Sequence, residues 1–441
     1  MLAANVPSSR TEAPHRPPEG ERPLPERLAA SFRKPGEALS PRELRQLLEQ
    51  LRDIVDPRVS EVEGGRRAKA LETWYAAAAP AARRDLWLLM SEQFMADPEK
   101  VRKAQAQYAA AVGTPDEAAA EVLYRRATVS PRRRVLQRFS ADEDGIRFLV
   151  DMRGEMQPWL KGDARLRALD VEMEYMFSTW FDVGFLELRR ISWDSPASLV
   201  EKLIKYEAVH DIRSWADVKN RLDSDRRCYG FFHPRLPGEP LIFVEVALTD
   251  AVVGSITPLL DETAAPADLS KATTAIFYSI SNTQPGLRGV SFGDSLIKQV
   301  VQTLKAEFPR LKVFATLSPI PGLRAWMNRV APAELMARLD DPLALGPKAP
   351  ERAELLAWAA RYLGRELDDG KPLDPVARFH LGNGARVERL NWAGDPSAKG
   401  LRQSFGLMVN YLYDLRRLDR HRSMLARGEI PISGDIEALY R

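Results

Sequence analysis

The chain of 441 residues contains little cysteine and little histidine. Its one cysteine, Cys228, excludes an internal disulfide and any metal site built from several thiolates. The five histidines are His15, His210, His233, His380 and His421. No two of them are four residues apart, the spacing at which a helix presents two zinc ligands on one face. We therefore predict that the protein has no metal site, and its cysteine usage is typical of a reducing compartment.

Long apolar runs and a large excess of one charge are also missing. No stretch reaches the ~18 uninterrupted apolar residues that a membrane-spanning helix requires. The 64 basic and 61 acidic residues leave a net charge of +3 at pH 7. This balance predicts neither a nucleic-acid partner nor a membrane partner. The composition is otherwise ordinary for a globular protein, and the length allows two or three domains.

Residues 1–38 form a proline-rich segment without the hydrophobic run of a secretory signal. Its glutamates, such as Glu12 and Glu19, argue against an organelle transit peptide, because such peptides are poor in acidic residues. We predict a disordered tail over residues 1–38 and a cytoplasmic location for the protein.

Residues 39–195 show helical periodicity. The sequence Ser40-Pro41-Arg42-Glu43 is a capping box with proline at the first helical position, and apolar residues recur on one face from Leu44 to Val55. Thr114 and Ser140 begin similar start signals. We predict an all-helical bundle over 39–195 that serves assembly or stability.

Residues 196–441 change to strands that alternate with helices, which indicates a mixed sheet. The expected strands are 227–232, 241–249, 274–282, 312–317 and 387–392, and the expected helices are 295–308, 332–339, 351–363 and about 406–425. The predicted fold class is therefore α+β and multidomain, with a helical bundle followed by a mixed α/β domain.

Ser318 follows an apolar run and begins the sequence Ser318-Pro-Ile-Pro-Gly322. Proline fixes its own φ, lacks a donor and restricts the residue before it, so Ser318 is expected to stand at a rigid strand end. Strand ends in α/β sheets often present ligand-binding groups. Ser318 is a candidate functional residue, with an ordinary strand exit as the alternative.

A glycine-rich turn connects the expected strand 274–282 to the helix that follows it. Its glycines allow the backbone to approach a ligand closely, and Arg288 with the next helix N-terminus suits a phosphate. The turn matches neither the Walker loop nor the dinucleotide-binding pattern Gly-x-Gly-x-x-Gly. A phosphate site and an ordinary turn both remain open.

Parts of this sequence resemble two known protein families. Arg288-Gly-Val-Ser-Phe-Gly293 resembles the Arg-Gly-x-Gly-x-Gly loop with which the N-acetyltransferase superfamily binds the pyrophosphate of coenzyme A, with Ser291 in place of the middle glycine. Residues ~200–415 look more specifically like malonyl-CoA decarboxylase. That likeness rests on ordered segments, among them 206–210, 227–233, 275–281, 314–322, 379–381 and 406–413.

The resemblance to malonyl-CoA decarboxylase implies a site. In that family the serine of Leu-Ser-Pro-Ile-Pro-Gly and the histidine of Phe-His-Leu form the catalytic pair, which places the pair here at Ser318 and His380. The implied substrate- and CoA-binding residues are Ser279, Gln284, Gly286, Arg288, Gly289, Val290, Ser291, Phe292, Gly293, Asp294 and Tyr413. Eukaryotic members often carry a glutamate at the position of Ser291, so a role that needs that carboxylate does not carry over.

The resemblance also implies an activity and a partner. We expect decarboxylation of malonyl-CoA to acetyl-CoA and CO2 through a thioester enolate. His380 can act as general acid if its pKa lies near neutrality, and Ser318 can hydrogen-bond the substrate or relay the proton; which of the two delivers the proton stays open. The thioester is itself an electron sink, so neither metal nor organic cofactor is required. The helical half is expected to form a homo-oligomer, a dimer or tetramer. An acyl-CoA-dependent N-acyltransferase and a non-catalytic acyl-CoA sensor are the alternatives.

Overall fold

The computed structural model describes residues 15–18, 20–290 and 296–440, and its chain divides into two compact units. The helical unit comprises residues 1–182 and 284–291, and the sheet unit comprises residues 183–283 and 292–441. Each unit is described separately below, for its described residues.

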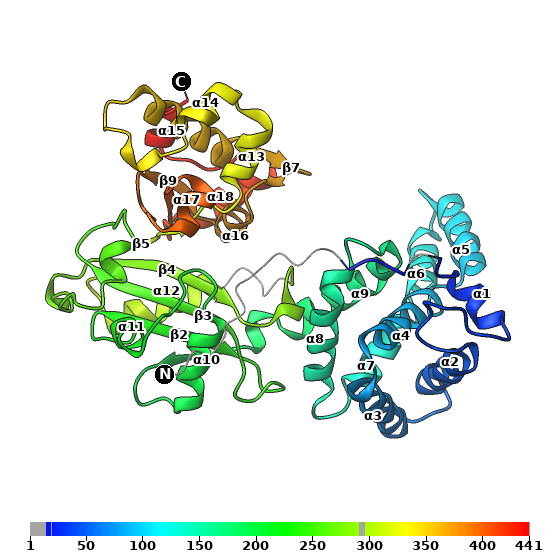
Figure 1. The fold of residues 1–441 in the computed structure, drawn as a ribbon. Helices are drawn as coiled ribbons and strands as arrows, with labels where there is room; N and C mark the ends of the chain where they lie inside the picture. Colours follow the sequence, from blue (N-terminus) through cyan, green and yellow to red (C-terminus); the bar gives the residue numbers. More distant parts are fainter. Residues whose placement is uncertain (1–14, 19, 291–295, 441) are drawn as a thin grey trace. The chain divides into compact units, whose positions relative to one another are not determined.

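The helical unit consists of helices joined by short loops (Figure 1). Ser40 and Glu43 form the predicted capping box, in which Ser40 Oγ accepts from Glu43 N at 3.3 Å and Glu43 Oε2 accepts from Ser40 N at 2.7 Å. The helices are α1 (Leu24–Ala29), α2 (Pro41–Val55), α3 (Glu61–Ala77), α4 (Pro80–Glu92), α5 (Pro98–Ala111), α6 (Glu117–Thr128), α7 (Arg132–Phe139), α8 (Gly145–Met156) and α9 (Arg167–Trp180), with 3-10 turns η1 (Gln157–Trp159), η2 (Ala164–Leu166) and η6 (Pro285–Leu287).

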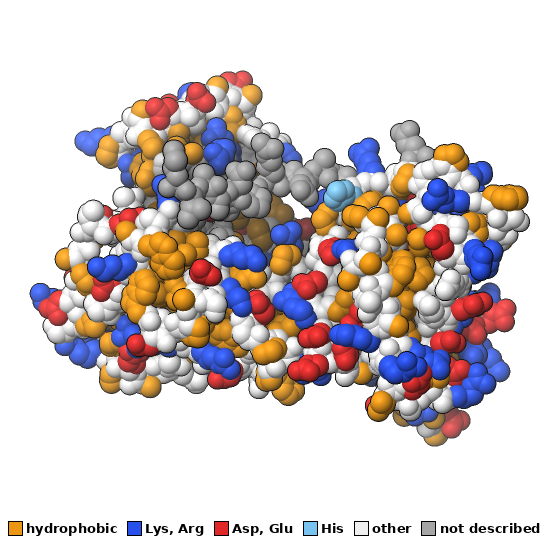
Figure 2. Space-filling model, turned by 60° about the horizontal axis from the view of Figure 1, so that its bottom comes forward, with side chains coloured by type: hydrophobic (Ala, Val, Ile, Leu, Met, Phe, Trp, Pro, Cys, Tyr) orange, Lys and Arg blue, Asp and Glu red, His pale blue; other side chains and the backbone are white. Residues whose placement is uncertain are grey.

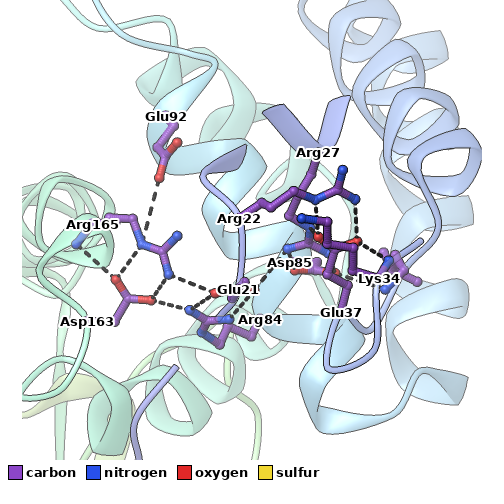
Figure 3. Close-up of polar contacts among 11 residues, drawn as sticks. Glu21, Arg22, Arg27, Lys34, Glu37, Arg84, Asp85, Glu92, Asp163 and Arg165 are labelled. Carbon is purple, nitrogen blue, oxygen red and sulfur yellow. Dashed lines mark hydrogen bonds and ion pairs between the residues drawn. The ribbon is translucent and has the colours of Figure 1, made fainter. Parts of the chain in front are cut away.

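Residues 20–38, predicted to belong to a disordered tail, are instead packed into the helical unit. Arg27 of α1 is 1% exposed, and its Nη1 and Nη2 donate to the two carboxylate oxygens of Asp85 at 2.7 and 2.6 Å. Glu21 accepts from Arg84 and Arg165, and Figure 3 shows these ion pairs as one connected cluster. The prediction was wrong for this stretch because it rested on proline content, whereas the charged residues find ion-pair partners at distant positions of the sequence.

The sheet unit is built on eight strands in the order β1-β2-β3-β4-β5-β10-β6, with β9 also paired to β10. All neighbours are antiparallel except β4 and β5, which are parallel. The strands are β1 (Glu187–Ile191), β2 (Arg226–Phe232), β3 (Pro240–Thr249), β4 (Thr274–Asn282), β5 (Val313–Thr316), β6 (Ser318–Pro319), β9 (Arg386–Asn391) and β10 (Met408–Leu412), and a separate hairpin holds β7 (Leu367–Asp368) and β8 (Lys371–Pro372). The mixed sheet after a helical region confirms the predicted fold class.

Helices and short turns connect these strands (Figure 1). They are α10 (Ala197–Tyr206), α11 (Trp215–Arg221), α12 (Leu296–Glu307), α13 (Leu323–Val330), α14 (Ala333–Arg338), α15 (Pro350–Gly364), α16 (Pro375–Gly382), α17 (Ala398–Ser404), α18 (Leu418–Ala426) and α19 (Gly434–Ala438), with 3-10 turns η3 (Val183–Phe185), η4 (Thr257–Leu259), η5 (Leu269–Lys271) and η7 (Pro342–Ala344). One buried cluster packs Ile276 of β4 against Ala315 of β5 and Met408 of β10, so the core runs across the centre of the sheet.

Two predicted helical segments are strands in the structure. Glu187–Ile191, expected in the helical half, pairs with β2 from Glu187↔Phe232 to Ile191↔Cys228. Met408–Leu412, expected within a helix over 406–425, is strand β10, which pairs with β5, β6 and β9, and only Leu418–Ala426 is helical. Both predictions followed local composition, and pairing with neighbouring strands overrides that preference. The second correction matters for function, because Tyr413 directly follows a strand.

The surface carries both charges. Figure 2 shows basic and acidic side chains interspersed on the face in view, with hydrophobic areas between them. No helix among the residues that the structure describes is long and apolar enough to cross a membrane.

Candidate active site

The site lies where β4 and β5 part. Their parallel register ends at the pair Phe277↔Thr316. Beyond it, β4 continues along β3 to Asn282, whereas Ser318 pairs with Val409 of β10. Two neighbouring parallel strands thus take different partners from the same point onward. Such a divergence frees backbone groups and side chains at the sheet edge for a ligand.

A β-bulge in β4 lies at the same level. Phe277 pairs with Val246 and Ser279 pairs with Glu245, so Tyr278 between them has no partner residue on β3. Bulges occur preferentially beside active sites, because the extra residue redirects the side chains that follow it.

Ser318, His380 and Tyr413 meet in one buried network. Ser318 Oγ lies 3.2 Å from His380 Nε2, and His380 Nδ1 lies 2.8 Å from the Tyr413 hydroxyl. The three side chains come from β6, from the last turn of α16 and from the residue after β10, and they are 5%, 3% and 3% exposed. All three residues were predicted as site residues. The structure brings them together although Ser318 and His380 are 62 positions apart in the sequence and His380 and Tyr413 are 33 apart.

The hydrogen bonds of this network have a defined direction. Ser318 Oγ donates to Thr316 Oγ1 at 2.8 Å, so its lone pairs face His380 Nε2. A neutral imidazole carries one N–H, which must then be on Nε2 and donate to Ser318. Nδ1 is left as the acceptor for the Tyr413 hydroxyl, whose pKa burial raises above its ordinary value. The hydrogen bonds are thus donated in one direction, from Tyr413 to His380, from His380 to Ser318 and from Ser318 to Thr316.

Burial lowers the pKa of His380 to about 3. The ring is enclosed by aromatic side chains, stacked on Tyr411 at a centroid distance of 4.8 Å and edge-on to Phe379 at 5.1 Å. A cation in such surroundings loses its hydration without gaining a counter-charge. The near-neutral pKa expected for His380 is therefore wrong for the free protein, in which the imidazole is neutral at pH 7.

This low pKa predicts how stability depends on pH. An unfolded histidine titrates near 6.5, so below that pH the unfolded chain binds a proton that the folded His380 does not. We expect the free energy of unfolding of the wild type to fall by about 2 kcal/mol more than that of His380→Asn between pH 7 and pH 5. Urea denaturation of both proteins at the two pH values measures the difference, and parallel pH slopes contradict it.

Helix α16 is fixed from its first turn. Asp374 is its N-cap and accepts from Val376 N at 2.9 Å and from Ala377 N at 3.0 Å. The second oxygen of Asp374 accepts from the Tyr362 hydroxyl at 3.4 Å, and burial raises the pKa of this carboxyl. The cap sets where α16 begins and therefore where His380 stands in its last turn.

Ser279, predicted to contact substrate, is bonded to a carboxylate. Its hydroxyl lies 2.9 and 2.8 Å from the two oxygens of Glu207, which also accepts from Ser281 at 3.3 Å. Glu207 follows α10 and accepts the backbone N–H of His210 at 2.9 Å. Ser279 thus stands on β4 beyond the point of divergence, with its hydroxyl engaged in the free protein.

The glycine-rich turn belongs to the helical unit. Gln284 Oε1 accepts from Arg147 at 2.8 Å, and Arg153 of α8 donates to the carbonyls of Gly286 and Arg288 at 2.8 and 2.9 Å. A Cβ on Gly286 would lie 1.8 Å from a carbonyl oxygen of α8, so glycine is required there by packing. The remaining predicted residues of this turn that the structure describes are Gly289, at φ +82°, and Val290. Ser291, Phe292, Gly293 and Asp294 lie outside the described residues.

Two residues of the site were missed from the sequence. Thr316 accepts from Ser318, and Tyr411 stacks on His380. Thr316 stands two residues before Ser318 and Tyr411 two before Tyr413, and side chains two apart on a strand share a face. Strand periodicity over 408–412 was the signal that would have identified Tyr411.

Two protein-family models together match nearly all of the chain from residue 94 onward. A model described as the malonyl-CoA decarboxylase C-terminal domain matches residues 184–441. A model described as the malonyl-CoA decarboxylase N-terminal domain matches residues 94–181.

Curated proteins and solved structures agree with these matches. The mitochondrial malonyl-CoA decarboxylase of Anser anser anser is 37% identical over 65% of this chain and 65% of its own length, and that of Rattus norvegicus is 37% identical over 67% and 68%. The chain thus matches about two thirds of the length of these curated relatives. The crystal structure of malonyl-CoA decarboxylase from Rhodopseudomonas palustris is similar with a TM-score of 0.79 at 40% identity, covering 90% of this chain and 99% of that one.

Proposed function

The chain belongs to the malonyl-CoA decarboxylase family, and we propose that it converts malonyl-CoA to acetyl-CoA and CO2 at the centre formed by Ser318, His380 and Tyr413. The observation that carries the proposal is the directed hydrogen-bond chain through His380, located where β4 and β5 part. This network contains a serine hydroxyl and an imidazole N–H, two groups suited to hold a carboxylate and to deliver a proton.

The chemistry asks three things of the protein. Loss of CO2 leaves the electrons of the broken C–C bond as a thioester enolate, and one proton then adds to the α carbon. The site must hold the carboxylate out of the thioester plane, stabilise the enolate oxygen and supply that proton. Because the thioester accepts the electron pair, the proposed reaction uses neither metal nor organic cofactor.

His380 acts in its neutral form, with its proton on Nε2. Nε2–H gives that proton to the α carbon, directly or through Ser318, while Nδ1 takes the proton of the Tyr413 hydroxyl to which it is hydrogen-bonded. A proton from water then returns Tyr413 to its hydroxyl form.

The other parts of the proposal follow family likeness. We assign acyl-CoA contacts to Ser279 and to the turn residues predicted above, namely Gln284, Gly286, Arg288, Gly289, Val290, Ser291, Phe292, Gly293 and Asp294, with Arg288 binding a phosphate. A homo-oligomer formed through the helical unit and a cytoplasmic location remain predictions.

One incubation tests the function. Purified protein is mixed with malonyl-CoA in EDTA, without ATP and without an acceptor amine. We expect acetyl-CoA and CO2 in equal amounts, at a rate that an added amine does not change. Protein that binds coenzyme A but releases no CO2 contradicts the decarboxylase and favours the transferase or the sensor.

A further inference from the structure

Thr316, the last residue of β5, lies behind Ser318 and is fully buried at 0% exposure. Its Oγ1 accepts from Ser318 Oγ at 2.8 Å and from the backbone N–H of Tyr411 at 3.1 Å. Its carbonyl oxygen accepts from Asn410 Nδ2 at 2.6 Å. Thr316 is therefore held by two consecutive residues of β10, and it holds the Ser318 hydroxyl in turn.

We propose that Thr316 is a positioning residue that selects the tautomer of His380 through Ser318, an inference that rests on the decarboxylase function proposed above. A serine hydroxyl rotates freely and has one proton and two lone pairs. Thr316 Oγ1 accepts the hydrogen bond that this proton makes, so the lone pairs of Ser318 Oγ are directed toward His380. The imidazole can then meet Ser318 only with a proton on Nε2.

Removing the Thr316 hydroxyl reverses the direction of the hydrogen bonds in this network. Without Thr316 Oγ1, the Ser318 hydroxyl donates to its other neighbour, His380 Nε2, at 3.2 Å. The neutral ring then carries its proton on Nδ1 and donates to the Tyr413 oxygen, 2.8 Å away. Nε2, the nitrogen on the side of Ser318, no longer has a proton to give. The hydroxyl of Thr316 thus decides which ring nitrogen is the acid.

Three substitutions separate this role from a packing role. Thr316→Val removes the acceptor and keeps the shape, whereas Thr316→Ser keeps the hydroxyl. Thr274→Val is the matched control, because Thr274 is a buried threonine on the neighbouring strand β4 at 2% exposure. Thr316→Ala replaces Thr316→Val if the valine variant does not fold.

The tautomer is read by NMR of the free protein labelled with 15N-histidine, and kcat and KM are measured with malonyl-CoA. We expect Thr316→Val to move the His380 proton from Nε2 to Nδ1 and to lower kcat about 10- to 100-fold at similar KM. Thr316→Ser and Thr274→Val are expected to keep the wild-type tautomer and to stay within about threefold of its kcat, because neither removes the acceptor of the Ser318 hydroxyl.

The proposal is overturned if Thr316→Val keeps the proton on Nε2, or if Thr316→Ser loses as much kcat as Thr316→Val. Because the tautomer is measured without substrate, it still tests Thr316 if the wild type proves not to decarboxylate malonyl-CoA. The wild type can lack turnover and still carry the His380 proton on Nε2. If Thr316→Val then moves that proton to Nδ1, the result contradicts the proposed reaction but not the role of Thr316.

Discussion

His380→Asn is expected to lower kcat for malonyl-CoA decarboxylation by about 10²- to 10⁴-fold, the usual contribution of a positioned general acid. Asparagine keeps a polar side chain but cannot give up a proton at neutral pH. Ser318→Ala, which removes the group between the imidazole and Thr316, is expected to fall in the same range. Release of CO2 and formation of acetyl-CoA are followed in both variants, with circular dichroism to verify folding.

His421→Asn is the matched control for this experiment. His421 is a second buried histidine, at 5% exposure, but its Nδ1 lies 2.9 Å from the Gly384 carbonyl and not in the network of His380. We expect it to keep kcat within about threefold, although its stability can fall through the lost bond. Folded His380→Asn protein with near-normal turnover would place the reaction elsewhere.

Arg27→Met is expected to destabilise the helical unit by about 3–5 kcal/mol, the cost of leaving a buried charge without its partner. Arg27 and Asp85 are both 1% exposed at their side chains and form two parallel hydrogen bonds. After the substitution, Asp85 keeps only the backbone N–H of Leu39, at 3.1 Å, among the contacts described. Calorimetry and denaturant unfolding of the full chain measure the loss.

Two further variants test whether the buried ion pair causes the loss of stability in Arg27→Met. Arg58→Met breaks an ion pair with Asp56 in which Arg58 is 89% exposed, and it is expected to leave the stability almost unchanged because water screens the pair. The double variant Arg27→Met/Asp85→Leu removes both buried charges and is expected to recover most of the stability. A loss for Arg27→Met no larger than that for Arg58→Met contradicts the assigned role of the buried pair.

Local signals in the sequence predicted much of the framework. The strand expected at 274–282 is β4 with the same bounds, and the capping box at Ser40 begins α2. Ser318 was located by its two prolines, and His380 and Tyr413 by family likeness. These signals come from neighbouring residues, since capping and periodicity depend on positions only a few residues apart.

Other features escaped those signals. The strand β10 was predicted as a helix, because pairing with β5, β6 and β9 is not visible in its own residues. The ion pair between Arg27 and Asp85 joins positions 58 apart, and the residues around Arg27 were predicted as part of a disordered tail. Tyr411 was missed because its segment was predicted as a helix, and Thr316 was missed because the sequence does not show that Ser318 donates to it.

The sequence by itself determined where most strands and helices lie, which family the chain resembles and which serine and histidine are the candidate pair. Only the tertiary structure decided the chemistry of that pair. A pKa near 3 follows from aromatic enclosure without a counter-charge, and the tautomer follows from a threonine on a strand that the histidine does not share. Both properties depend on side chains that approach through space, and the order of residues along the chain does not encode those distances directly.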